Sequence, residues 1–204
     1  MTYQVISVVP QDKKKVKICL DNGDTFILYK GEAVKLSLFE NEVFDDVKYQ
    51  QIMKDILGKR ATKRAMHLLE RQERTEKQLR DKLQQNNYPK PCIEQAIAYV
   101  KSYHYVDDYR YASVYIRYRQ EKESRQKLTQ KLMMRGISRE IIELAMEEEF
   151  VADECAQIEE LLRKRGFDPE SADDTIRRKT IQFLIRKGFK SRDIFRIIRQ
   201  EEEY

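Results

Sequence analysis

Apolar and polar residues alternate near the N-terminus of the chain and then change to a helical period. In residues 15–20 every second side chain is apolar, the pattern of a strand with one buried face. Residues 3–9 and 25–29 supply two further apolar runs, and Asn22-Gly23 tolerates the positive φ that a type I′ hairpin turn requires. We expect a three-stranded meander that packs on the next part of the chain or on a partner. A helical stretch then contains Val34, Leu36 and Leu38.

From about residue 48 the apolar positions follow a helical period, and the pattern repeats. An apolar pair four residues apart is followed by a turn residue, another apolar residue and a further helix. Successive copies lie 49 and then 52 residues apart. The apolar residues are Leu79, Leu83 and Tyr88; Leu128, Leu132 and Ile137; and Leu184 and Phe189. The turn positions are Asn87, Gly136 and Gly188, residue types that enter the left-handed conformation at helix ends.

Each copy contains two further helices. The helix after the turn begins its apolar face at Ile93 and Ile97, at Ile141 and Ala145, or at Ile194 and Ile198. The helix before the apolar pair spans 53–72, 107–121 or 151–165. Because a three-helix unit of this size has little core, we expect neighbouring units to stack into an elongated, curved rod. The sequence thus predicts a mainly α fold, with a β extension at 1–50 and three-helix repeats at 51–106, 107–150 and 151–204.

Composition agrees with amphipathic helices and adds a strong segregation of charge. Of the 204 residues, 37% are charged, and the net charge is +5. Basic residues exceed acidic ones by nine in residues 61–139 and by seven in 161–200, whereas residues 140–160 carry nine acids and no base. The last acids are Glu201, Glu202 and Glu203. A basic segment neutralises phosphates or meets an acidic protein surface, and the alternative is a set of solvated helix faces with mutual ion pairs.

Several features indicate a cytoplasmic protein. No apolar run approaches the ~18 residues that a membrane span needs, and the N-terminal residues lack the order of a signal peptide. The three cysteines, Cys19, Cys92 and Cys155, are too widely separated for a disulfide framework or a zinc knuckle. We therefore expect a reduced, cytoplasmic protein, a monomer without membrane contact.

The sequence does not assemble a recognisable catalytic, metal or cofactor site. Neither a Walker A nor a dinucleotide-binding glycine motif occurs. His67 lies among apolar residues of a helix, and His104, at a helix end, is better suited to capping than to catalysis. Paired aspartates can bind catalytic metals, but each pair here lies where a helix is predicted to start and suits an N-cap. These pairs are Asp45-Asp46, Asp107-Asp108 and Asp173-Asp174.

Three-helix units with a tight turn also resemble helix-turn-helix DNA readers. In the third copy the last helix carries Lys190, Arg192, Arg196 and Arg199, whereas its counterpart in the second copy, after Arg139, is acidic and would repel phosphate. A uniform array of DNA-reading helices is therefore excluded. The tyrosines of 99–118 can stack on bases, but their spacing favours packing between helices. They are Tyr99, Tyr103, Tyr105, Tyr109, Tyr111, Tyr115 and Tyr118.

Three short segments carry recognisable motifs, and the first two are residues 74–83 (RTEKQLRDKL) and residues 105–112 (YVDDYRYA). The first resembles the R-T-x-x-E-L-R-x-K-L motif of the RecX family, and the second resembles another motif of that family, around two aspartates. Residues 117–119 and 127–137 resemble a third. The likeness is good over 70–148 and weaker over 150–204, and many family members carry an N-terminal extension. The matching residues are Thr75, Leu79, Arg80, Leu83, Asp107, Asp108, Tyr111, Ala112, Leu128, Leu132, Gly136 and Ile137.

The chain departs from the family pattern at several positions. Gln78 and Lys131 replace glutamates, Asn87 replaces a glycine, and the glycines expected at His104 and near Ser124 are absent. Asn87 retains access to the left-handed conformation, so the turn is preserved. Loss of the two acids makes this part of the chain more basic than the family pattern.

RecX proteins are regulators of the RecA recombinase. The resemblance implies three tandem three-helix repeats, no enzyme activity, and no cofactor. It also implies binding to RecA, as monomer and as filament on single-stranded DNA, with inhibition of ATPase, strand exchange and coprotease activity. The alternative is a helical-repeat protein that acts directly on nucleic acid; a weak DNA contact is expected in either case. Our candidate contact residues are basic: Arg117, Arg119, Arg125, Lys127, Lys131, Lys179, Arg186, Lys190, Arg192 and Arg196.

Overall fold

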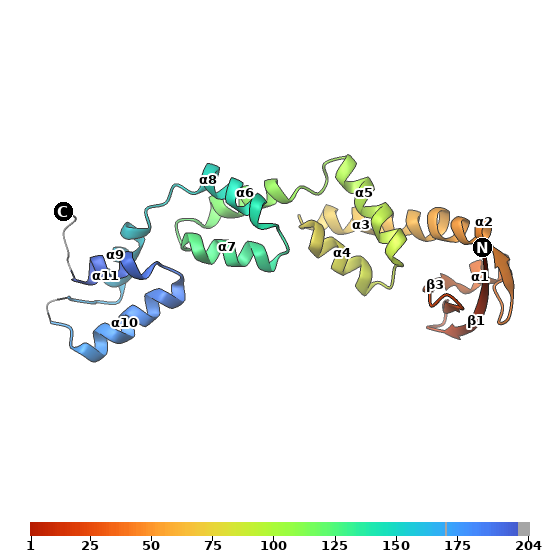
Figure 1. Cartoon of the computed structure of the whole chain (residues 1–204), viewed down its shortest axis with the longest axis horizontal. Helices are drawn as coiled ribbons and strands as arrows, with labels where there is room; N and C mark the ends of the chain where they lie inside the picture. Colours follow the sequence, from red (N-terminus) through yellow and green to blue (C-terminus); the bar gives the residue numbers. More distant parts are fainter. Residues whose placement is uncertain (170, 200–204) are drawn as a thin grey trace. The chain divides into compact units, whose positions relative to one another are not determined.

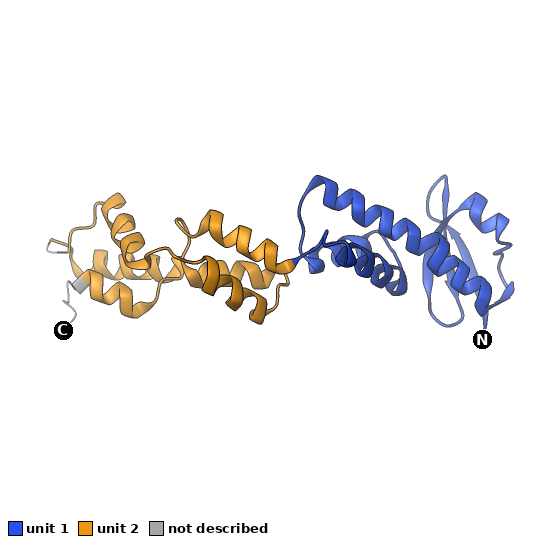
Figure 2. Ribbon diagram, turned by 90° about the horizontal axis from the view of Figure 1, so that it is seen from above, with its two compact units in different colours: residues 1–107 blue, residues 108–204 orange. Residues whose placement is uncertain are grey.

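Most of the chain is helical, and a small sheet lies at its N-terminus (Figure 1). In this computed structural model, residues 1–169 and 171–199 are described, without the side chain of Arg199. The acidic tail at 201–203 lies outside the described residues. Contacts divide the chain into residues 1–107, unit 1, and residues 108–204, unit 2 (Figure 2). The prediction of a mainly α chain with an N-terminal β element is confirmed.

The N-terminal sheet has four antiparallel strands in the order β3-β2-β1-β4. The predicted meander consists of β1 (Thr2–Pro10), β2 (Lys15–Leu20) and β3 (Thr25–Tyr29). This meander is confirmed, and the sheet has one further strand that the sequence does not predict, β4 (Val43–Asp45), which pairs with the start of β1. A strand of three residues is too short for a two-residue period to be visible in the sequence.

The turn between β2 and β3 contains Asn22-Gly23, but it is not of type I′. Only Gly23 has positive φ, at 86°. The N–H of Gly23 donates to the carbonyl of Leu20 at 3.1 Å, and the N–H of Leu20 donates to Asp24 at 2.9 Å. This is the three-residue hairpin loop in which a type I turn precedes a left-handed residue.

The helices of unit 1 differ in their limits from the prediction. Helix α1 (Lys30–Lys35) ends before Leu36, and Leu38 is buried beyond it. A continuous helical run then consists of α2 (Asp46–Gln50), η1 (Gln51–Gly58) and α3 (Lys59–Arg71), so it begins seven residues before the predicted start (Figure 1). The segment η1 is a π-helix, whose hydrogen bonds join residues five apart. Its buried Ile52 and Leu57 have that spacing.

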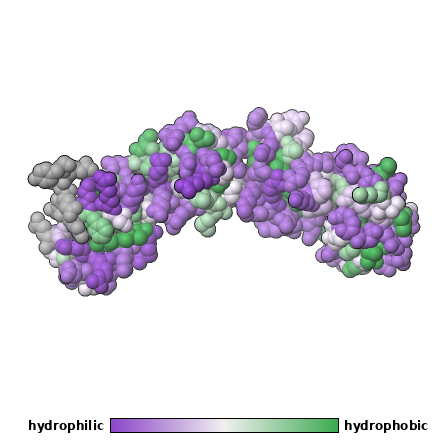
Figure 3. All heavy atoms as spheres, in the orientation of Figure 1, coloured by the Kyte–Doolittle hydropathy of each residue, from purple (hydrophilic) through white to green (hydrophobic). Residues whose placement is uncertain are grey.

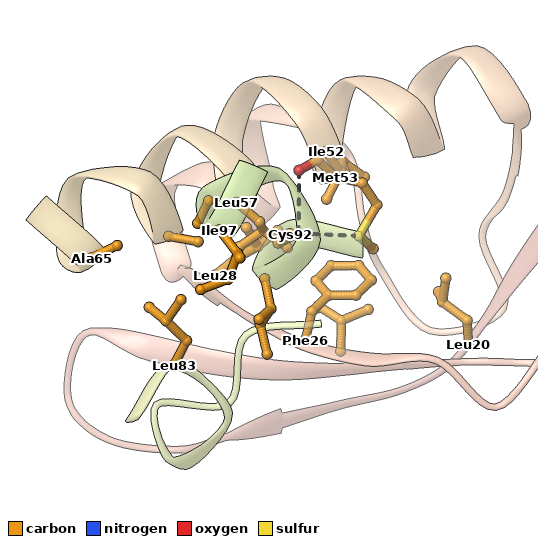
Figure 4. Packing of buried hydrophobic residues seen from close by; sticks show 14 of the residues in the cluster. Leu20, Phe26, Leu28, Ile52, Met53, Leu57, Ala65, Leu83, Cys92 and Ile97 are labelled. Carbon is orange, nitrogen blue, oxygen red and sulfur yellow. Dashed lines mark hydrogen bonds between the residues drawn. The ribbon is translucent and has the colours of Figure 1, made fainter. Parts of the chain in front are cut away.

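The sheet and the first helices share one hydrophobic core (Figure 4). Phe26 and Leu28 of the sheet pack in it with Leu57 of η1 and with Ile97 of α5 (Lys90–Ser102). Helix α4 (Glu76–Gln85) adds Leu79 and Leu83. The three predicted strands therefore pack on the next part of the chain, as expected.

Unit 2 contains two helix sets, each with its own core cluster. Their helices are α6 (Asp108–Arg119), α7 (Arg125–Met134) and α8 (Arg139–Glu149), and then α9 (Glu154–Lys164), α10 (Asp174–Lys187) and α11 (Ser191–Arg199). Leu128, Leu132 and Leu184 are fully buried, as the repeat predicts. In the third set buried Thr180 lies where Leu79 and Leu128 lie in the others. The predicted start of the apolar face of α8 at Ile141 is wrong, because Ile141 is only half-buried. Ile142 and Met146 occupy the positions equivalent to Ile93 and Ile97.

The predicted left-handed helix ends are confirmed. Asn87, Gly136 and Gly188 have φ values of 59°, 84° and 91°. In each case the next residue donates its N–H to a carbonyl five residues earlier, as in the Schellman motif; Tyr88, for example, donates to Leu83 at 3.3 Å. His104, with φ of 56°, ends α5 in the same way, which agrees with its predicted capping role.

Candidate interaction surface

The basic candidates of the second helix set are largely paired with acids of the same set. Both guanidinium contacts of Arg117 are to Glu149, at 2.9 and 2.5 Å. Hydrogen bonding from Arg117 lowers the pKa of Glu149 and keeps it charged. Glu123 pairs with Lys131 at 2.6 Å and with Arg119 at 3.3 Å. The free positive charge on this set is therefore smaller than the sequence indicates.

Arg125 and Lys127 lie near the start of α7, and both are half-buried. The guanidinium of Arg125 lies 5.7 Å from the ring centroid of Phe150, a cation–π contact. The backbone N–H of Arg125 donates to the Glu154 carboxylate at 2.9 Å. These contacts hold α7 against the start of α9, so Arg125 has a structural role beside any role in binding.

Four basic candidates of the third set are exposed. Lys179 and Arg186 lie on α10, Arg192 lies on α11, and Lys190 lies between the two helices. Among the described residues no acid lies within ion-pair distance of these four. In the sequence, the spacings of seven and four residues predict that Lys179, Arg186 and Lys190 form one row on the exposed side of a single helix. That prediction is wrong in its last member, because α10 ends at Lys187 and Gly188 turns the chain.

Two other predictions for the third set are also wrong. Arg196 is half-buried, and its guanidinium donates to the Cys155 thiol at 2.6 Å, so it turns toward α9. Helical spacing places Arg178 on the same side as Ile181 and Ile185, which predicts that this side of the helix faces the core. Instead, Arg178 is exposed, whereas Arg177 turns inward and donates to the Pro169 carbonyl at 3.1 Å. The cause is the buried face of α10, which runs through Thr180 and Leu184 rather than through Ile181 and Ile185.

A groove of about 640 Å³ lies in unit 2 between α7, α8 and the turn from α10 to α11. It brings together Arg125 and Lys190, candidates that the sequence places 65 residues apart. Acids and apolar side chains line it too, and Met133 is 50% exposed. We call it the inter-repeat groove. The other lining residues that matter below are Arg139, Glu143, Glu147, Glu154, Ile142 and Met146.

The hydrogen bonds that connect the two helix sets of unit 2 cannot be predicted from the sequence. The Ser124 hydroxyl is buried, accepts the Lys127 N–H at 3.3 Å as N-cap of α7, and donates to the Lys187 carbonyl at 2.9 Å. A side chain at Gly188 would approach that hydroxyl within 2.6 Å. The Gln120 side chain accepts from Val151 at 2.8 Å. A serine before a helix signals a cap, but no sequence pattern reveals its partner 63 residues away.

The residues of the family motifs have mostly structural roles. Thr75 is fully buried and forms a capping box with Gln78, so Gln78 takes the capping role of the glutamate in the family motif. Arg80 donates to Glu76 at 2.8 Å and to both oxygens of Glu94 at 2.7 and 2.9 Å. Asp107 and Asp108 lie at the start of α6, Ala112 is buried, and Tyr111 packs against the second core.

The tyrosines of 99–118 divide into two groups. Tyr109, Tyr111 and Tyr115 pack against the core of the second set, as predicted. Tyr99, Tyr103 and Tyr105 are exposed; the Tyr103 ring is stacked on Tyr105 and tilted against Tyr99. Tyr118 is 80% exposed. The prediction that all seven pack between helices is therefore wrong for these four, whose positions lie at helix ends or face solvent.

Most of the visible surface is hydrophilic (Figure 3). Within the described residues, no group of three or more His, Cys, Asp or Glu side chains is arranged to hold a metal ion. None of the described helices has the length and apolarity that crossing a membrane requires. Cys92 is a packed core residue: its thiol donates to the Met53 carbonyl at 3.3 Å (Figure 4), and burial raises the pKa of Cys92 to about 12.

Known proteins are similar to this chain in sequence and in fold. The regulatory protein RecX of Clostridium beijerinckii is 26% identical over 96% of this chain and 93% of its own length. That of Clostridium acetobutylicum is 27% identical over 98% and 95%. A crystal structure of regulatory protein RecX covers 98% of this chain and all of its own, with a TM-score of 0.65 and 21% identity. RecX from Lactobacillus salivarius covers 71% of this chain and 96% of its own, with a TM-score of 0.57 and 23% identity.

Three family descriptions match in chain order. The first, second and third three-helix domains of RecX match residues 61–99, 107–146 and 152–198. Together these segments cover more than half of the 204 residues, and each contains a left-handed turn that precedes its last matched helix. The chain belongs to the RecX family of regulatory proteins.

Proposed function

We propose that this protein binds the RecA recombinase, as monomer and as filament on single-stranded DNA, and inhibits its ATPase, strand exchange and coprotease activities. The observation that carries the proposal is the match of all three RecX domains, in order, together with relatives named regulatory proteins that align over almost the whole chain. The protein acts by binding, without catalysis or a cofactor, in the cytoplasm and as a monomer.

The inter-repeat groove supports a protein partner over a DNA partner. Glu143, Glu147 and Glu154 line it together with Arg125 and Lys190. Arg139 also lines the groove and pairs with Glu143 at 2.7 Å. The acids therefore balance the bases, and the groove offers no net positive charge to a phosphate backbone. A protein segment offers both signs of charge, and the exposed, flexible Met133 side chain adapts to an apolar residue. We assign this groove to RecA.

The exposed cations of the third set support a long-range role. Lys179, Arg186 and Arg192 are exposed, with no acid within ion-pair distance among the described residues, so they attract an acidic protein surface or the DNA of the filament. Side chains on solvated helix faces supply attraction rather than specificity. The paired candidates Arg117, Arg119 and Lys131 contribute less, because a partner must first displace Glu149 or Glu123.

A comparison of two affinities tests the proposal against the alternative of direct action on DNA. Binding to labelled single-stranded DNA is measured by anisotropy, bare and coated with RecA of the same species. We expect the coated strand to bind more tightly at physiological salt. Equal affinity for bare and coated strands would favour the DNA-binding alternative.

The non-catalytic role has its own test. Purified protein is incubated with single-stranded and duplex DNA in the presence of Mg²⁺ or Mn²⁺. We expect no cleavage. Metal-dependent cleavage that is abolished by Asp107→Ala, with helical content intact, would overturn this part of the proposal.

A further inference from the structure

Unit 1 contains a basic cleft that none of the roles above uses. It has a volume of about 450 Å³ and lies between the sheet, helix α3 and the turn after α4. Lys15 and Tyr29 come from β2 and β3, Lys63 and Arg64 from α3, and Asn87 from the turn. The first RecX domain matches only from residue 61, so the strand side of this cleft lies outside the matched segments. We call it the N-terminal cleft.

The fold explains why these groups meet. Lys15 and Tyr29 are direct cross-strand partners, so their side chains lie on the same face of the sheet, and the Lys15 ammonium lies 5.7 Å from the Tyr29 ring centroid. On α3, Arg60 lies 4.9 Å from the same ring. Lys63 and Arg64 follow on the cleft side of α3. Tyr29 is 43% exposed and lines the cleft, so a ligand in the cleft can contact it.

The charge of the cleft is positive and only partly neutralised. Arg60 pairs with Glu32 at 2.5 Å, and His67 lies 3.5 Å from Glu70. Arg64 is held by a neutral group, the Asn86 side-chain oxygen, at 2.9 Å. Within the described part of the chain, no carboxylate pairs with Lys15, Lys63 or Arg64. Three cations therefore remain available to an anion.

We propose that the N-terminal cleft binds a nucleotide unit, with its phosphate on Lys15 and Lys63 and its base on the Tyr29 ring. Lysine ammonium groups bind phosphate as point charges, and an exposed aromatic ring stacks on any base. The side-chain amides of Asn86 and Asn87 line the cleft as hydrogen-bond donors and acceptors for a base edge. A duplex hides its base faces, so the nucleotide comes from a single strand or is free in solution.

Matched double variants of the full chain test this site without RecA. Lys15→Ala with Lys63→Ala removes two cleft cations, and Lys54→Ala with Lys90→Ala removes two exposed lysines of unit 1 outside it. Anisotropy of labelled oligo(dT) of twelve nucleotides reports binding of a single strand, and fluorescence of a methylanthraniloyl-labelled ADP reports a free nucleotide. Circular dichroism confirms that each variant keeps its helical content.

We expect the cleft variant to bind at least one of the two probes about twentyfold more weakly than the control variant at about 0.1 M salt. This factor follows if each of the two lost phosphate contacts lowers the slope of log affinity against log salt concentration by roughly 0.7. Loss with oligo(dT) alone assigns a single strand, and loss with the labelled ADP assigns a free nucleotide. Tyr29→Leu should weaken binding about tenfold, and Tyr29→Phe should retain it, because stacking needs only the ring. Equal affinities of the cleft and control variants for both probes would overturn the proposal.

Because the assay contains no RecA, its outcome is independent of the proposed regulatory function. A cleft that serves an acidic protein segment instead would leave both nucleotide affinities unchanged and would count against the inference. Photo-crosslinking of an iodouracil-containing strand gives a second readout: the crosslinked peptide should contain Tyr29 or Tyr88. Crosslinks confined to unit 2 would contradict a site for a single strand.

Discussion

Single residues at helix ends determine how the two helix sets of unit 2 meet. Ser124 caps α7 and also reaches the last turn of α10, where Gly188 leaves room for its hydroxyl. One side chain therefore satisfies groups from two repeats. In an isolated helix, a serine at this position would only cap the helix. Removing the Ser124 hydroxyl loses both the cap of α7 and the hydrogen bond to α10.

We predict that Ser124→Ala destabilises the protein by about 2 kcal/mol, about 1 from the lost cap and about 1 from the lost hydrogen bond to Lys187. Ser138→Ala is the matched control, because Ser138 caps α8 through Ile141 but is exposed. It should cost about 1 kcal/mol. Urea unfolding followed by circular dichroism measures both; equal losses would show that the bond to Lys187 contributes nothing.

A second prediction at this scale concerns acid stability. The hydrogen bond from Arg80 lowers the pKa of Glu94 below its ordinary value of 4.5. A carboxyl with a lowered pKa stabilises the fold above its ordinary pKa, and this contribution is lost as pH falls through the folded value. Glu94→Gln should therefore lower the melting temperature at neutral pH, and the difference from the parent should shrink below about pH 4.5.

Glu42→Gln serves as the control for the acid titration, since Glu42 is exposed and, among described residues, forms no salt bridge. It should leave the melting temperature unchanged at neutral pH. A difference between parent and Glu94→Gln that stays constant from neutral pH down to about pH 3 would contradict the role given to the Arg80–Glu94 pair.

Residue types predict local roles well and long-range partners poorly. The left-handed turns at Asn87, Gly136 and Gly188 follow from backbone sterics, which the sequence displays directly. The pairing of Arg117 with Glu149 depends on how α6 and α8 pack, and no local pattern contains that information. The candidates can therefore be identified from the sequence as basic, but their availability to a partner cannot.

At the scale of elements, periodicity locates most helices but not all boundaries. The repeat of leucines identifies α4, α7 and α10 because each buries the same face. Strand β4 escapes prediction because three residues show no period. The π-helical hydrogen bonding of η1 escapes it because the buried Met53 and Leu57 also fit the four-residue spacing of an ordinary α-helix. The predicted buried face of α10 is wrong because Thr180 takes the place of an apolar residue.

The exposed basic residues of α10 and α11 carry a prediction at this scale. Neutralising Lys179, Arg186, Lys190 and Arg192 to alanine should weaken binding to RecA filaments and flatten its salt dependence. The slope should fall by roughly 0.7 per lost contact if the partner is single-stranded phosphate. Arg196 is left unchanged because it contacts Cys155. Helical content should be retained, since these side chains are exposed.

The control for this set removes four exposed lysines of unit 1: Lys54, Lys77, Lys82 and Lys90. Both variants lose the same charge, so a difference between them reports position rather than net charge. If the third-set variant binds filaments as tightly as the parent across a salt titration, those residues are only a solvated face. The contact would then lie in the second set, around Arg117, Arg119, Arg125, Lys127 and Lys131.

On the scale of the whole chain, membership of the RecX family is better supported than any division into domains. The division at 1–50, 51–106, 107–150 and 151–204 stays a prediction. The sheet and the first helices share one core, and contacts group the chain at residue 107. Truncation tests the first boundary: a fragment that begins at residue 51 should unfold at a lower temperature than the intact chain, because the core cluster would lose Phe26 and Leu28.

The rate of DNA-dependent ATP hydrolysis by RecA of the same species tests the central claim most directly. RecA is assembled on single-stranded DNA, the protein is added in increasing amounts, and binding to the filament is followed in the same samples. We predict that the rate falls as the protein binds and reaches a low plateau at saturation. An unchanged rate at saturating protein, with binding confirmed, would contradict the assignment of this chain as an inhibitor of RecA.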